Sequence, residues 1–406
     1  MSSVYIVLMI LMVLLNLFSI YLAVIALNLF KKHVPFPHAD PATRFAVVIP
    51  ARNEANVLCH LIAALNAQEY PSGLVDIYVA ANHCTDDTVA TARRLGAEVI
   101  ECSDDVRIKG DVLHQAIAAL MPRAYDAYAF FDADNLPAPD FLQRINDAFA
   151  AGETVCKGRL KAGNASASWV AGDYGLYHAL MEWTYSRPHT AAGFSSNLVG
   201  TAFAVRREVF EEMGGWNTVT ICEDSEFAAQ CTRMGHRVCF VPEALSYDEQ
   251  VTGFGTSLRQ RRRWCYGMVQ AARRMTASMF SPDNPRPAMA RDFGMLFIIS
   301  HTAPLAMLVM LLSLPFQPKA MWLGMGGSLV LSWVGMTLLG LLLCPLGGYP
   351  LKEMKGAVLL HPLFMASWVP LQVMALFWPV KQWTPIAHMG QADVAGSIPA
   401  SKADGA

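Results

Sequence analysis

The stretch "FAVVIPARNEANVLCHLIAALNAQ", residues 45–68, joins two hydrophobic patterns of different period. Residues 45–51 form a short apolar run that ends at Pro50 and Ala51, which is typical of a strand buried on both faces of a parallel sheet. From Glu54 onward, apolar residues recur at helical spacing. A buried strand that leads directly into a helix predicts a β-α unit, and such units build α/β folds.

Three further strand patterns follow, and helical patterns separate them. The predicted strands are "VDIYVAAN" (75–82), "EVIEC" (98–102) and "AYAFFDAD" (127–134), and the predicted helices between them cover 84–97 and 110–121. Thr85 or Asp86 is expected to cap the first of these helices, and Gly96 is expected to end it. The β-α-β-α-β-α-β order predicts an open, mainly parallel sheet with helices on both faces. Ligands bind such sheets at the carboxyl ends of the strands.

The hydrophobic composition indicates a membrane protein. Charged residues make up 16% of the 406 residues and hydrophobic residues 54%, whereas soluble domains carry roughly 25% charged residues. The apolar run Val4–Phe30 exceeds the roughly 20 residues that a spanning helix needs. Lys31 and Lys32 follow it and place that end in the cytoplasm by the positive-inside rule. We therefore expect a multi-pass protein of the cell (inner) membrane with a cytoplasmic catalytic part.

More apolar runs lie near the C-terminus, at about 293–316, 321–346 and 356–380. Prolines within the first and last of these runs allow one of them to be re-entrant or interfacial, which leaves the number of spans and the side of the tail open. The expected division of the chain is an N-terminal transmembrane helix (1–32), a catalytic domain (44–250), amphipathic interfacial helices (251–292), about three membrane segments (293–383) and a tail (384–406).

The remaining composition limits partners and cofactors. The nine cysteines form no C-x-x-C pair, so a zinc site is not expected, and in the cytoplasm they should stay reduced and unpaired. An isoelectric point of about 6.6 with a single basic cluster argues against a nucleic-acid partner. The sequence leaves the oligomeric state open.

Acidic and polar residues follow the predicted strands. Asp132 and Asp134, in "FFDADN", would share one side of a strand end, where paired carboxylates suit a divalent ion that also binds a diphosphate. An Asp/Asn/Pro-rich turn is the alternative. Glu54 could accept hydrogen bonds from a ribose or a base, or merely occupy the first turn of a helix. Asn82 could contact a base edge or shape a turn, and Lys109 could reach a phosphate, although a lone surface lysine is the commoner explanation.

A second acidic pair lies farther along, in "TICEDSEF" (220–227). The neighbouring carboxylates of Glu223 and Asp224 repel each other, and the pKa of one can rise enough for it to act as a general base. The alternative is that Asp224 caps the helix predicted from Ser225 onward.

The arginine cluster "LRQRRRW", residues 258–264, divides into two groups if it is helical. Three residues at i, i+3 and i+4 share one face: Gln260, Arg263 and Trp264. That face offers a bidentate donor for phosphate oxygens beside an aromatic ring for a sugar. The other arginines point elsewhere and suit anionic lipid headgroups: Arg259, Arg261 and Arg262. A purely lipid-facing helix is the alternative.

Taken in this order and spacing, these residues resemble the membrane-integrated family 2 glycosyltransferases, which include the cellulose, chitin, hyaluronan and poly-N-acetylglucosamine synthases and the ceramide glucosyltransferases. The resemblance runs from about Phe45 to Trp264. It is carried by Glu54 of the P-x-x-N-E entry, Asp132 and Asp134 of D-x-D, Asp224 of the E-D motif, and Gln260, Arg263 and Trp264 of Q-x-x-R-W.

The resemblance implies a glycosyltransferase-A fold, an inverting reaction, a nucleotide sugar (commonly a UDP sugar) and Mg²⁺ or Mn²⁺. Asp132 would contact the nucleotide and the metal, and Asp134 the metal. Asp224, beside Glu223, would be the general base, and Arg263 would offset charge on the leaving diphosphate. Gln260 and Trp264 would bind the acceptor. The segment 194–207, with Ser195 and Gly200, falls where the family lines its acceptor pocket.

Two departures and several alternatives accompany this resemblance. The second strand ends in Asn82 where the family has Asp, and the family's Gly-Lys with a later Asn reads Ile108-Lys109 and His114 here. A polymer or oligosaccharide synthase is slightly favoured over a single-transfer enzyme with a lipid acceptor. A catalytically inactive membrane scaffold is opposed by the intact acids, and a nucleotidyltransferase would not need Q-x-x-R-W.

Overall fold

A computed structural model describes residues 3–316 and 319–380. Its centre is one sheet of eight strands in the order β3-β2-β1-β4-β7-β6-β8-β5. The strands are β1 (Phe45–Ala51), β2 (Val75–Ala81), β3 (Glu98–Glu101), β4 (Ala127–Phe130), β5 (Leu136–Pro137), β6 (Val155–Ala162), β7 (Phe203–Arg206) and β8 (Val238–Asp248). β7 is antiparallel to both of its neighbours, and β5 is antiparallel to β8, so the sheet is mixed but mostly parallel.

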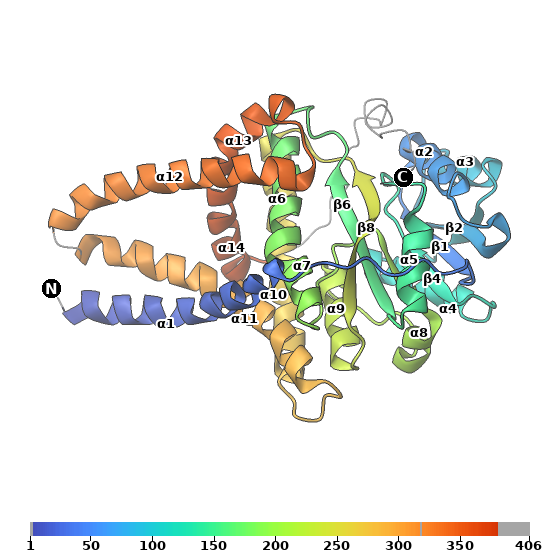
Figure 1. Ribbon diagram of the computed structural model, residues 1–406, viewed down its shortest axis with the longest axis horizontal. Coiled ribbons are helices and arrows are strands. Elements are labelled where there is room, and N and C mark those ends of the chain that lie inside the picture. The colour runs from blue at the N-terminus through green and yellow to red at the C-terminus, as the bar shows by residue number, and fades with distance from the viewer. Residues whose placement is uncertain (1–2, 317–318, 381–406) are drawn as a thin grey trace.

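Helices cover both faces of the sheet, as the alternating β-α pattern predicts (Figure 1). In the catalytic part they are α2 (Ala55–Asn66), α3 (Thr88–Arg94), α4 (Lys109–Leu120), α5 (Phe141–Ala150), α6 (Trp169–Met181), α7 (Arg187–Ala191), α8 (Arg207–Met213) and α9 (Glu223–Arg233). Alternate residues of β1 enter two separate cores: Ala46 and Val48 pack with α4, α8 and α9, whereas Val47 and Ile49 pack with α2 and α5.

The predicted strands and helices of residues 45–134 are confirmed, with one difference. The carboxyl group of Asp86 accepts the Thr88 backbone N–H (3.0 Å) near the start of α3, and Gly96 adopts a left-handed φ of 87° where that helix ends. β4 ends at Phe130, however, so Asp132 and Asp134 follow the strand in a turn instead of extending it. The alternative of a turn is therefore correct for the backbone of Asp132 and Asp134. The alternation of side chains along a strand does not determine where these two carboxylates point.

The remaining helices connect the catalytic part to the membrane segments. They are α1 (Ser3–Ala26), α10 (Phe254–Met279), α11 (Pro287–Ser313), α12 (Lys319–Gly347), α13 (Leu351–Ala366) and α14 (Trp368–Phe377). By length and composition, four stretches could cross a membrane: Ser3–Phe30, Pro287–Phe316, Gly326–Gly347 and Leu351–Phe377.

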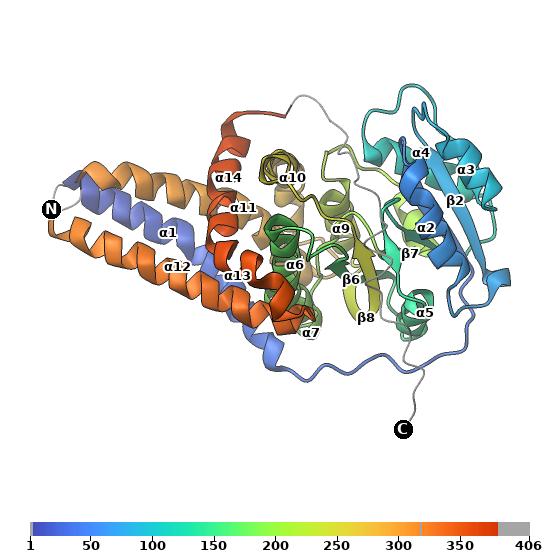
Figure 2. The ribbon, with the colours of Figure 1, turned by 90° about the horizontal axis from the view of Figure 1, so that it is seen from above.

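These four stretches do not all run in the same direction. Helices α1, α11 and α12 project together from one end of the molecule, whereas α13 and α14 run across their base, next to α6 and α10 (Figures 1 and 2). The last apolar run therefore has the geometry of an interfacial segment, one of the arrangements that its prolines allow. All nine cysteines are unpaired in the structure.

Candidate active site

A cavity of about 830 Å³ lies at the carboxyl ends of the central strands and reaches helices α10, α11 and α14. Residues at the end of β1, Asn82 after β2 and the turn after β4 form one end, the start of α9 and the helix α10 form the middle, and α11 and α14 form the other end. Most of the predicted site residues line it: Glu54, Asn82, Lys109, Asp132, Asp134, Gly200, Glu223, Asp224, Gln260, Arg263 and Trp264.

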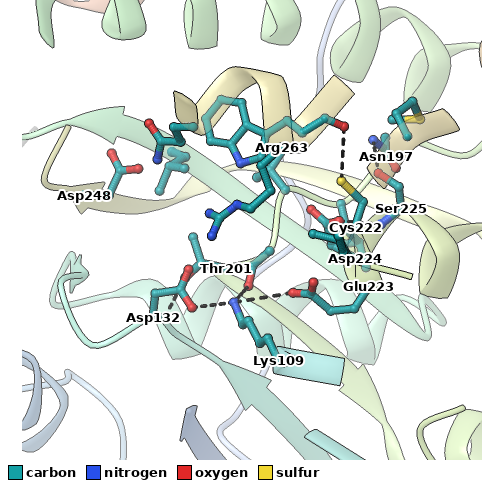
Figure 3. A pocket seen from close by; sticks show the side chains of 18 of the residues that line it. Lys109, Asp132, Asn197, Thr201, Cys222, Glu223, Asp224, Ser225, Asp248 and Arg263 are labelled. Atoms are coloured by element: carbon teal, nitrogen blue, oxygen red, sulfur yellow. Dashed lines mark hydrogen bonds and ion pairs between the residues drawn. The ribbon is translucent and has the colours of Figure 1, made fainter. Parts of the chain in front are cut away.

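Lys109 holds the centre of the site together (Figure 3). Its ammonium group donates to Asp132 and to the backbone oxygen of Gly200 (2.7 Å), and it lies 3.7 Å from Glu223 Oε1. Burial alone would lower the pKa of Lys109, but the attraction of Asp132 and Glu223 outweighs it and raises that pKa. Lys109 is thus part of an ion-pair network in the cavity, and its reading as a lone surface lysine is wrong.

The two acids of the second pair begin helix α9, where the helix dipole favours negative charge. Asp224 Oδ1 accepts the backbone N–H of Ser225 (2.7 Å). Burial raises the pKa of Glu223 to about 7, against the attraction of Lys109, and burial also raises the pKa of Asp224. A buried carboxyl with a pKa near neutrality is suited to accept a proton from an attacking hydroxyl group.

A third acid of the cavity, Asp248 at the end of β8, was missed by the sequence-based reasoning. Its Oδ2 accepts from Gln250, and its Oδ1 is buried with no partner among the described residues. Burial, followed by the charge of Asp134, raises the pKa of Asp248 well above the usual range. The sequence did contain a signal for Asp248: it is an acid at the end of an apolar strand, and other predicted site residues also follow strands.

The carboxylates of Asp132, Asp134 and Asp248 fit a divalent cation held jointly with a diphosphate. The described residues include no ready-made group of three metal-ligating side chains. Mg²⁺ and similar ions commonly use only one or two carboxylates together with substrate phosphates and water. The unpartnered Oδ1 of Asp248 and the charge that Asp134 exerts on it are therefore compatible with such an ion.

The Q-x-x-R-W residues lie on α10, as the helical spacing predicts. Gln260 accepts a hydrogen bond from the Tyr174 hydroxyl (2.9 Å), and Trp264 stacks on Trp368 at a centroid distance of 6.3 Å. Arg263 points toward the space between Asp248 and the Lys109–Asp132 pair (Figure 3). The predicted face is thus directed into the cavity.

The expectation that Arg261 contacts lipid headgroups is wrong. Arg261 is 0% exposed, and it donates to the backbone oxygen of Phe364 and to Ser257 Oγ, both at 3.1 Å. Its guanidinium group lies 4.0 Å from the ring centroid of Phe364. Arg261 points away from the cavity, as the helical geometry predicts, but helix α13 covers this side of α10 and buries it. Arg259 is exposed, as expected.

Ser195, predicted to contact the acceptor, is also misplaced. Ser195 is 0% exposed and does not line the cavity. Inside the core, its hydroxyl oxygen accepts hydrogen bonds from the Val238 N–H (2.9 Å) and from the Thr232 hydroxyl (2.8 Å). The part of this segment that lines the cavity begins two residues later, at Asn197. Gly200 does lie at the site, since a Cβ there would be 3.6 Å from Asp224 Oδ2.

Asn82 and Glu54 line the end of the cavity formed by the first strands. Asn82 is 8% exposed, and its Oδ1 is buried without a partner among the described residues. Such an oxygen is available to a ring N–H of a nucleobase. The Glu54 backbone N–H donates to Thr88 Oγ1 (2.8 Å), which positions the start of α2 beside α3.

The fold and the acid-rich cavity define a sugar-transferring enzyme of the glycosyltransferase-A class. Residues 41–267, more than half of the chain, match the family described as "Glycosyltransferase like family 2", and the chain belongs to that family. The resemblance inferred from the motifs is therefore confirmed, as is the glycosyltransferase class of the enzyme.

Curated relatives are similar over the same region. The probable glycosyltransferase YdaM of Bacillus subtilis is 23% identical over 58% of this chain and 58% of its own length. The beta-monoglucosyldiacylglycerol synthase of Nostoc is 25% identical over 55% of this chain and 49% of its own. The cellulose synthase catalytic subunit of Xanthomonas axonopodis is 25% identical over 60% of this chain and 34% of its own. The chain thus spans about half the length, or less, of two of these relatives.

A solved structure supports the fold. The mannosyltransferase PcManGT from Pyrobaculum calidifontis, in complex with GDP-Man and Mn²⁺, matches with a TM-score of 0.62 at 19% sequence identity. The match covers 92% of this chain and 98% of that chain. The likeness therefore includes the helices that flank the sheet.

Proposed function

We propose that this chain transfers one sugar from a nucleotide sugar to a hydroxyl group of a lipid acceptor at the membrane surface, with inversion at the anomeric carbon. The observation that carries the proposal is the composition of the cavity beyond the catalytic acids. In the part of the cavity farthest from the strands, the wall consists mainly of apolar side chains of the interfacial and membrane helices, including Leu296, Ile299, Ala303 and Trp368. An apolar chain fits such a wall, whereas a glycan would need polar partners for its hydroxyl groups.

The residues of the site would divide the reaction as follows. Asn82 and Glu54 bind the nucleoside, and Asp132 and Lys109 hold its phosphate end. Asp224, with Glu223 beside it, removes the proton from the acceptor hydroxyl as that oxygen attacks the anomeric carbon. Arg263 donates hydrogen bonds to the departing diphosphate, whose negative charge increases as the glycosidic bond breaks.

Asp134, Asp132 and Asp248 would hold Mg²⁺ or Mn²⁺ against the diphosphate. Such an ion supplies positive charge that stabilises the leaving group. The solved mannosyltransferase contains Mn²⁺, which supports divalent metal use without distinguishing the two ions.

The nucleobase of the donor is best identified by comparing UDP sugars with GDP sugars. A UDP sugar is the donor expected from the family resemblance, and one relative is named as a UDP-forming synthase. The solved mannosyltransferase instead holds GDP-Man. The Oδ1 atom of Asn82, which has no partner among the described residues, can accept the ring N–H of either uracil or guanine. Because Asn82 is uncharged, unlike the Asp of the family, it does not require one particular base.

The catalytic part is proposed to lie in the cytoplasm of a cell whose inner membrane holds α1, α11 and α12. Cytoplasmic nucleotide sugars would then reach one end of the cavity, and lipid would reach the other end from the bilayer.

The test uses isolated membranes that contain the full chain, labelled UDP and GDP sugars, and the variant Asp224→Asn. We expect transfer to fall at least about 100-fold, because the amide cannot accept the proton. Glu208→Gln is the matched control, since Glu208 is an exposed acid in the first turn of α8 and does not line the cavity. Unchanged transfer by Asp224→Asn would refute the assignment of the base.

Product size separates the lipid acceptor from the second candidate, an oligo- or polysaccharide acceptor. That candidate is favoured by the likeness to cellulose synthase and to glucomannan 4-beta-mannosyltransferases. A product that extracts into organic solvent and carries one sugar supports the lipid acceptor. A water-soluble product of many sugars contradicts it.

A further inference from the structure

Lys157 lies in a part of the cavity wall to which the proposed reaction assigns no task. It belongs to β6, and its neighbours come from β8 and from the π-helical segment Glu182–Ser186 that follows α6. Lys157 is 7% exposed. Its ammonium group donates to Ser186 Oγ at 3.3 Å and lies 5.9 Å from the ring centroid of Phe240.

This ammonium group has no close counter-charge. None of the ion pairs among the described residues includes Lys157, although eight carboxylates line the same cavity. The acid of the neighbouring segment, Glu182, is already bound by Arg159 at 2.8 Å and by Arg187 at 2.6 Å. A buried cation without an ion-pair partner is costly, and an anionic ligand would remove that cost.

The surrounding groups do not offset the charge. Burial lowers the pKa of Lys157 to about 8, even though Asp224 and Glu182 attract its charged form. His178, which also lines this wall, has a pKa lowered to about 4 by burial and by the charge of Lys157, so it is neutral at pH 7. Lys157 and Asp224 line the same cavity.

The donor diphosphate is not the anion that this position fits. The phosphate-binding residues Lys109 and Asp132 gather at the end of β4, and β7 lies between β4 and β6 in the sheet. The backbones of β4 and β6 are two strand spacings apart, about 10 Å, so Lys157 enters the cavity from a different strand than the residues that follow β4. Lys109 and Arg263 already supply positive charge there.

We propose that Lys157 binds a carboxylate or phosphate group of a substrate next to the catalytic base. The anion belongs either to the transferred sugar, as the carboxylate of a uronic acid, or to the acceptor, as a phosphate near the accepting hydroxyl. The inference rests on the proposed function, since it requires sugar transfer in this cavity.

The experiment uses the full chain in phosphatidylcholine nanodiscs and two matched pairs of substrates. One arm compares the glucose and glucuronate donors on whichever of UDP and GDP the wild type accepts. The other compares diacylglycerol with phosphatidylglycerol as the acceptor. KM and kcat are measured for the wild type, Lys157→Met and Lys157→Arg.

Lys161→Met is the control variant. Lys161 lies on the same strand, outside the cavity wall, where it donates to the Gly348 backbone oxygen at 3.1 Å. It should leave every KM unchanged. The thermal unfolding temperature of each variant checks that it folds.

In one arm we expect the wild type to prefer the anionic substrate and Lys157→Met to raise its KM about 10- to 100-fold, the range of a charge-assisted hydrogen bond. The KM of the neutral substrate should not change, and Lys157→Arg should keep most of the preference. The arm that responds identifies the source of the anion.

Two outcomes overturn the proposal while transfer remains intact: no preference for an anion in either arm, or an equal change by Lys157→Met for charged and neutral substrates. If the wild type transfers no sugar in any arm, the proposed function itself is contradicted, and the inference fails with it.

Discussion

At the scale of single residues, the site depends on one lysine that serves three groups. Lys109 joins Asp132 and the Gly200 backbone, and it attracts both acids at the start of α9. Without that attraction, Glu223 and Asp224 would be protonated over a still wider range of pH. In the proposed reaction, Lys109 would therefore position the phosphate end of the site and favour the ionised form of the two acids.

This arrangement predicts an acid limb in the pH profile of transfer. Because burial raises the pKa of both carboxyls, that of Glu223 to about 7, the acidic pair binds a proton as the pH falls below neutrality and releases it as the pH rises. Transfer should therefore rise as the pH increases through about 7. The midpoint belongs to the pair and not to one acid.

Lys109→Met should move this limb to higher pH, because it removes a charge that lowers both pKa values. The residual kcat/KM is measured between about pH 5 and 9 at constant ionic strength. Lys161→Met should leave the limb in place. A limb that stays at the same pH in Lys109→Met would show that this network does not control the base.

At the scale of elements, helix α10 links the membrane side of the molecule to the chemistry. One of its sides presents Arg263 and Trp264 to the cavity, and another binds α13 through the buried Arg261. Its middle passes so close to the start of α9 that only a glycine fits: a Cβ on Gly267 would lie 2.5 Å from Cys222 Sγ and 2.8 Å from its backbone nitrogen. Cys222 directly precedes the catalytic acids.

Gly267→Ala should therefore damage catalysis without touching substrate. Relieving the contact must push α10 away from the start of α9, which changes the distance between Arg263 and Asp224. Displacements of about 1 Å can cost roughly 100-fold in rate, so we expect kcat to fall by that order. Initial rates at saturating donor measure the effect.

Gly255→Ala provides the comparison on the same helix, because a Cβ there meets no atom within 4 Å. It should retain full activity and match or slightly exceed the wild type in thermal stability, since alanine favours the helix. Equal activity of the two variants would mean that the close approach of α10 and α9 does not set the site.

At the scale of the whole molecule, the arrangement of the helices decides which substrates can meet. α1, α11 and α12 project away from the sheet, while α13 and α14 lie across their base (Figure 2). Trp368 and Gln372 of α14 line the cavity. Under the proposed function, a nucleotide would approach from the catalytic part and an apolar chain from the bilayer. This geometry also predicts that the link between α12 and α13 lies on the same side as the catalytic part.

Cysteine labelling in oriented membrane vesicles tests that topology. In a background where the three partly exposed cysteines (59, 84 and 102) are serine, Lys352→Cys should react with an impermeant maleimide only from the cytoplasmic side. Ser3→Cys, at the far end of α1, should react only from the opposite side. Labelling of Lys352→Cys from the outside would contradict the prediction that the link between α12 and α13 lies on the same side as the catalytic part.

The sequence by itself determined the local structure and the identity of most site residues. The strands of residues 45–130 and the helices between them follow from hydrophobic period, which is a property of short segments. The predicted cap is the exception: α3 begins after Asp87, and Asp86 accepts the Thr88 N–H without capping the helix. Acids at strand ends converge because parallel strands end at one edge of a sheet. The motifs then identified the family, which residues 41–267 confirm.

Only the tertiary structure decided the surroundings of particular side chains. Arg261 is buried because α13 returns from 103 residues later to accept its hydrogen bond, and Ser195 is buried because β8 passes over it. Asp248 and Lys157 reach the site from strands whose order in the sheet no local pattern reveals. Burial and charge depend on which distant elements pack together, and packing is a property of the whole chain.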